Sequence, residues 1–250
     1  MIDLTLAIAT CGRPFAVRRL LKSIEKYVTT PHKTILLDNT YYHDMSWNPN
    51  YGSNIDKNIE VNDRLIGCCE SNNLLAENCE TRYIMHLDDD VHLQSDIITP
   101  MYEKIKNSNY SIIGTRWKDD GYGGFRPPIK KYLMGYDYDG NRILYKLTLN
   151  DNAHFEWVES DESLHTMIVD KDVYKKVKWD NSYIWKGDRL DFFYNCKKHN
   201  IKTLIYLSDF VNHSPVPFKY KSVKEEQDSF DAVEYFTKKW GVTPLVGWNK

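Results

Sequence analysis

The stretch YIMHLDDD, residues 83–90, decides how this chain is interpreted. Its apolar run, residues 83–87, predicts a buried strand. Three carboxylates follow at once, and their like charges repel unless a cation or a bound polar ligand lies among the oxygens. Hard oxygen ligands suit Mg²⁺ or Mn²⁺, which often bridge carboxylates to phosphates. The stretch therefore predicts a metal and diphosphate site at a sheet edge, with an acidic turn before a helix as the plainer alternative.

The three aspartates are expected to have different roles. Asp88 and Asp90 are two residues apart, so on extended backbone they point to the same side. Either both approach the metal, or one reaches the ribose of a nucleotide and the other the metal. Asp89 points to the opposite side, where it supports the structure of the site.

Around this stretch, predicted strands alternate with helical patterns. Strands are expected at 4–9, 34–37, 59–61 and 83–87, and helices after Pro14 and over 68–78. Such alternation predicts an α/β fold with a mostly parallel, covered sheet. Ligands of these sheets gather beyond the carboxyl ends of the strands, where Asp38 and the three aspartates fall.

The second half of the chain is less regular. We expect helices over 97–105, 188–199 and 225–240, strands over 111–114, 143–149, 165–169 and 203–207, and loops over 41–58 and 119–128. No repeat or linker separates the halves, so a single domain over residues 1–250 is predicted.

Composition excludes several classes of protein. The 250 residues are 42% hydrophobic with a formal charge of −2, so no excess of positive charge indicates nucleic acid or an anionic membrane. The sequence has no long apolar span and its first residues do not resemble a signal peptide, so a cytoplasmic protein is expected. The five cysteines form no CxxC pair, which favours reduced thiols over a disulfide framework or a zinc site.

Four segments of the first half resemble family 2-like glycosyltransferases of the GT-A fold. TCGR at 10–13 is similar to that family's opening nucleotide-binding turn, and LLDNT at 36–40 to the end of its second strand. NDRLIG at 62–67 with ESNN at 70–73 resembles a family stretch in which Ala-Arg is common where Glu70-Ser71 stands. LDDD at 87–90 matches the DxD region. The resemblance extends to residue 213 through GDRLDFF at 187–193 and VNH at 211–213.

The resemblance implies a Rossmann-like GT-A domain with a nucleotide-sugar-binding half, about residues 1–95, and an acceptor-binding half, about 96–250. It implies a metal-dependent, inverting transferase that uses Mn²⁺ or Mg²⁺ and a UDP-sugar donor. The metal ligands would be Asp88, Asp90 and His213, with Asp90 at the last DxD position. The nucleotide-sugar contacts would come from these residues: Thr10, Arg13, Asp38, Arg64, Asn72, Asp88 and Asp89.

The chain departs from the family at the catalytic base. The family has a Glu-Asp pair whose Asp is the inferred base, and this chain has Asp188-Arg189. The base is therefore expected to be Asp191 or Asp188, which lie one helical turn apart. Asp191 ranks slightly higher, because Asp191-Phe192-Phe193 keeps the family pattern.

Two other functions stay open at this point. A non-catalytic carbohydrate- or nucleotide-binding protein could share the fold, and the altered base motif keeps this alternative open. A sugar nucleotidyltransferase is less compatible, because its Gly-rich opening loop is reduced here to Gly12. The acceptor of a transferase could be a glycan, a lipid-linked sugar, a protein or a hydroxylated nucleobase in DNA.

Overall fold

Four parallel strands form the part of the sheet that carries the acidic stretch. In the computed structural model, β1 (Leu4–Thr10) lies between β2 (Lys33–Asn39) and β4 (Tyr83–Asp88), and β3 (Lys57–Val61) flanks β2. The structure describes residues 2–39, 51–52, 54–119, 134–139, 142–147, 155–184, 186–214 and 230–245. The strands end at one edge, as expected for parallel strands joined by helices.

The sheet continues beyond β4 with mixed directions. The further strands are β5 (Val91–His92), β6 (Ile112–Asp119), β9 (Trp157–Ser160), β10 (Met167–Asp170) and β11 (Thr203–His213). Within the described residues the order is β3-β2-β1-β4-β10-β6-β11-β5, with β9 paired to β11. β10 is antiparallel to both of its neighbours, whereas β6 and β11 are parallel. The predicted α/β class, with a mostly parallel and mixed central sheet, is confirmed.

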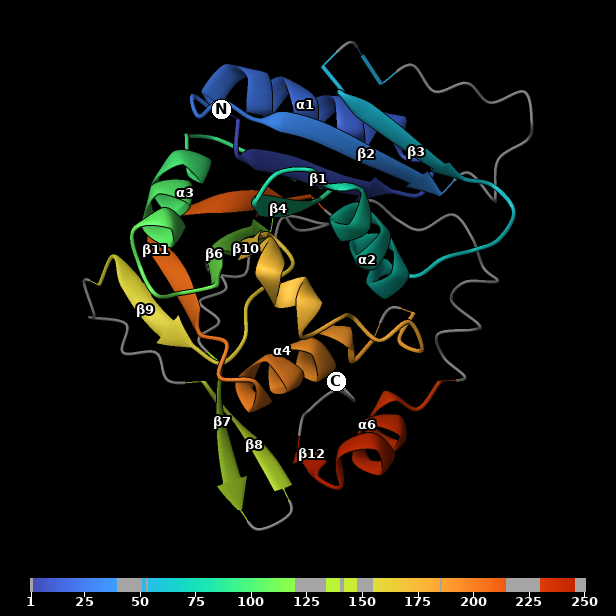
Figure 1. The fold of residues 1–250 in the computed structure, drawn as a ribbon, viewed down its shortest axis with the longest axis vertical. Helices are drawn as coiled ribbons and strands as arrows, with labels where there is room; N and C mark the ends of the chain where they lie inside the picture. The colour runs from blue at the N-terminus through green and yellow to red at the C-terminus, as the bar shows by residue number, and fades with distance from the viewer. Residues whose placement is uncertain are drawn as a thin grey trace.

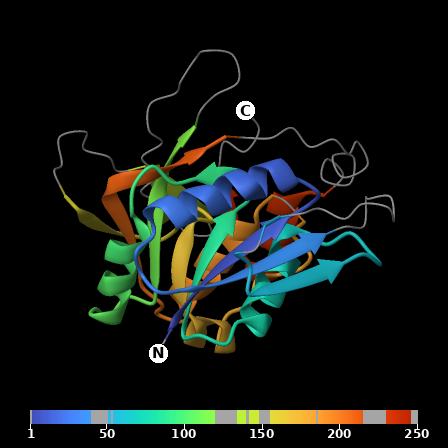
Figure 2. The ribbon, with the colours of Figure 1, turned by 90° about the horizontal axis from the view of Figure 1, so that it is seen from above.

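Helices cover both faces of this sheet (Figures 1 and 2). They are α1 (Pro14–Tyr27), α2 (Cys68–Asn78), α3 (Ile98–Lys106), α4 (Asp188–Lys198) and α6 (Ala232–Trp240), with a 3₁₀ turn η1 (Lys171–Lys175). Alternate residues of β1 point to opposite faces, which explains the layering. Leu6 and Ile8 pack in one core with α1 and α3, and Ala7 packs in the other with α2, α4 and α6.

A smaller sheet lies beside α6 (Figure 1). It consists of β7 (Met134–Asp139), β8 (Arg142–Leu147) and β12 (Thr243–Leu245), in the order β12-β8-β7. No helix in the described part of the chain combines the length and the apolar character needed to cross a membrane.

Most predicted elements of the first half lie where the sequence put them. The helix at 68–78 has the predicted bounds, and Pro14 occupies the first turn of α1. The predicted loops at 41–58 and 119–128 lie largely outside the described residues, although Lys57 and Asn58 already belong to β3. His86 is a buried core residue, as expected, and its Nε2 lies 2.6 Å from the Tyr174 hydroxyl.

Several predicted elements of the second half have other bounds in the structure. The final helix, predicted over 225–240, begins at Ala232 within the described residues, where the Asp231 side chain caps it by accepting hydrogen bonds from the amides of Val233 and Glu234; residues 225–229 lie outside the described part of the chain. The strand predicted over 111–114 runs to Asp119. The strand predicted over 203–207 runs on to His213, past an irregularity in its pairing with β6 after Tyr206.

The stacked pair of Phe192 and Trp179 gives a test of the core. Their rings are 4.0 Å apart and nearly parallel, and the Phe192 side chain is fully buried. We expect Phe192→Ala to lower the free energy of unfolding by about 3–5 kcal/mol, since it removes a buried ring and leaves a cavity. Phe15→Ala is the matched control, because Phe15 is 72% exposed. Urea denaturation measures both, and equal losses would contradict this packing.

Candidate functional site

The register of the sheet brings the acidic residues to one edge. Thr10 at the end of β1 pairs with Asp38 on β2, and the preceding Ala9 pairs with Asp88 on β4. Asp38 and the aspartates after β4 therefore flank the end of β1, where the chain turns into α1. The sequence reasoning that placed both at one sheet edge is consistent with this register.

The Asp89 side chain lies in the interior of the site. Its side chain is fully buried and accepts hydrogen bonds from Thr10 Oγ1 at 2.5 Å and from Arg13 Nε at 2.9 Å. A second Arg13 nitrogen, Nη2, donates to its other oxygen. Burial raises the pKa of Asp89 to about 7, while the Arg13 charge acts in the opposite direction. Asp89 thus fixes the turn between β1 and α1 to the end of β4.

Asp90 lies at the rim of the same cluster. Arg13 Nη1 donates to its carboxylate at 3.2 Å, and Arg19 donates to its backbone carbonyl at 3.2 Å. Burial raises the pKa of Asp90, and the like charge of Asp88 adds to this effect. Arg13 already offsets part of the charge of these neighbouring carboxylates, and their remaining oxygens can hold a cation.

The end of β11 approaches Asp90 from the other side. His213 Nε2 lies 3.6 Å from Asp90 Oδ1, and the amide of Ser214 donates to the Asp90 carbonyl at 2.9 Å. The His213 ring stacks on Trp117, with centroids 4.4 Å apart. The structure thus brings together Asp90 and His213, two residues proposed from the sequence.

His165 connects the acidic cluster to α4. Its Nε2 lies 2.8 Å from Asp188 Oδ2, and its Nδ1 lies 3.7 Å from Asp88 Oδ2. Burial opposes the charge on His165, but Asp188 and Asp88 raise its pKa well above the ordinary value. Desolvation alone would raise the pKa of Asp188 and of Asp88. The charge and hydrogen bonds of His165 outweigh it and hold both pKa values below the usual range. Asp188 therefore lies across one imidazole ring from Asp88.

Asp191 faces a different part of the molecule. Its carboxylate accepts hydrogen bonds from Lys239 Nζ at 2.8 Å and Trp240 Nε1 at 2.7 Å, both on α6. Tyr183 also donates to it, at 3.4 Å. Asp191 is fully buried and joins α4 to α6, whereas Arg189 reaches Glu162 at 3.5 Å and the Asp188 carboxylate meets His165 and Cys68.

The other residues predicted to contact the nucleotide are spread over β2, α2 and the segment before α2. Asp38 is buried and accepts a hydrogen bond from the Tyr51 hydroxyl. Asn72 is buried in α2. The Arg64 side chain is 56% exposed and pairs with Glu70 and Asp63. Within the described residues, no hydrogen bond or ion pair joins Arg64 to the three aspartates.

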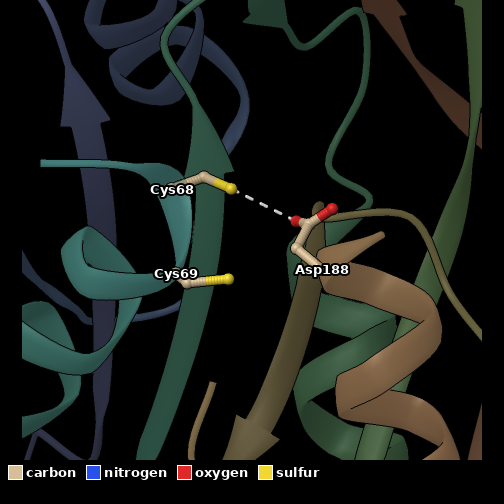
Figure 3. Close-up of side chains that lie close together, drawn as sticks. All are labelled: Cys68, Cys69 and Asp188. Atoms are coloured by element: carbon tan, nitrogen blue, oxygen red, sulfur yellow. Dashed lines mark hydrogen bonds between the residues drawn. The ribbon is translucent and has the colours of Figure 1, made fainter. Parts of the chain in front are cut away.

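A second cluster lies beside Asp188 (Figure 3). Cys68 and Cys69 open α2, and their sulfurs and one Asp188 oxygen all lie within 4.8 Å of one another. Cys68 Sγ is 3.2 Å from Asp188 Oδ2 and 3.3 Å from the Ile184 carbonyl. The sequence did not predict this set, because the cysteines are adjacent rather than spaced as CxxC and the aspartate is 120 residues away.

A glycine makes this contact between α2 and the 184 loop possible. A Cβ on Gly67 would lie 2.7 Å from the Ile184 carbonyl oxygen, closer than real Cβ atoms come to backbone. Any other residue at position 67 would push the first turn of α2 away from α4. The two thiols and Asp188 meet because this position lacks a side chain.

The two clusters suit different ions. Asp88, Asp90 and His213 offer oxygen and imidazole donors at a rim that already repels its own charge, which suits Mg²⁺ or Mn²⁺ completed by a ligand's phosphates. They do not form a compact set of three ligands in the described structure, where the only set within 4.8 Å is that of Cys68, Cys69 and Asp188. Sulfur ligands instead suit thiophilic ions.

Comparisons with known proteins bear on the fold. The sequence matches no model of a protein family and no curated protein. Among the solved structures that match is the crystal structure of residues 1–349 of TarS, a glycosyltransferase of S. aureus, with a TM-score of 0.60 and 12% sequence identity. The match covers 85% of this chain and 60% of that one, so the chain spans about three fifths of the TarS fragment. At this identity the similarity shows a shared fold.

Removal of Asp89 tests whether it supports the site structurally. We expect Asp89→Ala to lower the free energy of unfolding by about 3 kcal/mol, because it leaves the largely buried Arg13 charge without its main partner. Chemical denaturation gives this value.

The double variant Asp89→Ala with Arg13→Met is the control. It removes both charges, so it is expected to recover part of the loss. A double variant less stable than Asp89→Ala would contradict a direct coupling of the two residues.

Proposed function

We propose that this protein is a metal-dependent glycosyltransferase that moves a sugar from a nucleotide-diphosphate sugar, in the first place a UDP-sugar, to an acceptor hydroxyl. The observation that carries the proposal is the division of the acidic triplet. Asp89 is buried in an ion pair with Arg13, while Asp88 and Asp90 flank it at the carboxyl edge of a Rossmann-like sheet. The similarity to the fold of a glycosyltransferase supports the same conclusion.

The residues at the rim fit a divalent ion held together with a diphosphate. Asp90 and Asp88 would supply carboxylate oxygens, and His213, steadied by its stack on Trp117, would approach from β11. An ion bound there would neutralise the charge that develops on the departing diphosphate. Arg13 already spans Asp89 and Asp90 and adds a fixed positive charge at the same edge.

Asp38 is the proposed contact for the nucleoside. It ends β2 beside Thr10, at the point where α/β sheets of this type bind nucleotides. The hydrogen bond from Tyr51 orients one of its oxygens. Thr10 and Asp89 would then act indirectly, by holding the turn that forms this side of the pocket.

Asp188 is the proposed general base. It lies across His165 from Asp88, near the proposed donor. Asp191 instead accepts hydrogen bonds from α6. His165 donates to the Asp188 carboxylate and keeps it ionised, so it can accept a proton. The acceptor oxygen would attack the anomeric carbon and lose its proton to Asp188. The bond from that carbon to the diphosphate would break, and the anomeric configuration would invert.

Asp90→Asn tests the donor site. Binding of a UDP-sugar with Mn²⁺ at about 100 times its Kd should stabilise the native protein by about 2.7 kcal/mol. We expect Asp90→Asn to lose the Mn²⁺-dependent part of this stabilisation in a thermal-shift panel of UDP-sugars.

The matched control is Asp172→Asn, which alters an exposed aspartate paired with Lys175. It should respond to donor and Mn²⁺ as the native protein does. Equal Mn²⁺-dependent stabilisation of the native protein and Asp90→Asn would count against the assignment of Asp90.

A comparison of two variants on α4 tests the base. We expect Asp188→Asn to lower kcat by about 100- to 10,000-fold with donor binding retained, because only proton transfer is removed. Asp191→Asn should mainly lower the melting temperature, since it weakens the contact with α6. Release of nucleoside diphosphate gives kcat, and full activity of Asp188→Asn would refute its role.

A further inference from the structure

The cluster of Cys68, Cys69 and Asp188 differs chemically from the acidic triplet. It offers two sulfurs and one carboxylate oxygen within 4.8 Å of one another, from α2 and α4 (Figure 3). Ligands of a zinc ion lie about 2.0–2.3 Å from the metal, so a small contraction of this set would suffice to surround one. Three protein ligands also leave a fourth tetrahedral position for water.

The surrounding structure holds these donors in place. Gly67 lets the first turn of α2 approach Ile184. Gly187, the N-cap residue before α4, has φ 85°, a backbone conformation that other residues rarely adopt. His165 donates a hydrogen bond to Asp188 and orients its carboxylate, as hydrogen-bond partners of metal ligands commonly do. Cys68 is only partly buried, which gives an ion a route from solvent.

We propose that Cys68, Cys69 and Asp188 form a cation site, separate from the acidic triplet, that takes Zn²⁺ or another thiophilic divalent ion. Thiolate sulfurs select such ions, whereas Mg²⁺ and Mn²⁺ prefer the oxygen ligands at the sheet edge. On binding, each thiol releases its proton to solvent, and Asp188 binds as the carboxylate.

Occupation of this site has a consequence that rests on the proposed function. An Asp188 oxygen bound to zinc is withdrawn from proton transfer. Zn²⁺ therefore inhibits sugar transfer, while Mn²⁺, which is taken at the acidic triplet, supports it.

Cobalt binding tests the site without donor, acceptor or activity. Co²⁺ replaces zinc and gives a sulfur-to-cobalt charge-transfer absorption only when thiolates bind it. We expect the reduced native protein to show this band at one equivalent of Co²⁺, and Zn²⁺ to abolish it. Cys68→Ser and Cys69→Ser should lose the band or bind Co²⁺ more than about tenfold more weakly.

Two control variants test whether Co²⁺ binds at Cys68, Cys69 and Asp188. Cys79→Ser changes a thiol just after α2, whose sulfur contacts Thr81, and should keep the band. Asp90→Asn alters the acidic triplet and should also keep it. Thermal melts identify any variant that fails to fold. Absence of the band in the native protein, or a band with unchanged Co²⁺ affinity in folded Cys68→Ser and Cys69→Ser, would overturn the proposal.

An activity measurement separates this inference from the proposed function. If the protein transfers sugar, one equivalent of Zn²⁺ should slow release of nucleoside diphosphate in the native protein and slow it less in Cys68→Ser. Equal inhibition of both proteins would overturn the inhibitory role. A native protein that shows the cobalt band but transfers no sugar would refute the proposed function and leave the cation site standing.

Discussion

The ion pair of Arg13 and Asp89 is the interaction on which the site depends. Two nitrogens of the guanidinium bind both oxygens of one buried carboxylate, and Thr10 binds the same group. A buried carboxylate is costly unless it is paired and hydrogen-bonded in this way. The pair joins the start of α1 to the end of β4, and so places Asp88 and Asp90 on either side of a fixed point.

The first half of the fold could be predicted because its signals are local. The buried strand before Asp88, the proline that opens α1 and the apolar spacing of Val17 and Leu20 each depend on residues close in sequence. Parallel strands end at a common edge, so the neighbourhood of Asp38 and Asp88 followed from topology. The alternation expected for extended chain does not hold at Asp89 and Asp90, which lie in a turn after β4 where Arg13 contacts both carboxylates.

The resemblance to a family placed His213 with Asp90, but other parts of the site could not be predicted, because their contacts join distant residues. Nothing around His165 in the sequence indicates that its ring lies between Asp88 and Asp188. The resemblance to the family favoured Asp191 over Asp188 as the base. The sequence around the two aspartates does not indicate that Asp191 is the one bound by α6. The start of α6 is set by a local signal instead, the side chain of Asp231 that caps it.

The link between Asp191 and α6 connects the C-terminal helix to the turn of α4 that carries Asp188. Asp188 and Asp191 lie on the same first turn of α4, so a shift that α6 transmits through Lys239 and Trp240 tilts the whole turn. A displacement of α6 would therefore be transmitted to the turn of α4 whose Asp188 carboxylate meets His165.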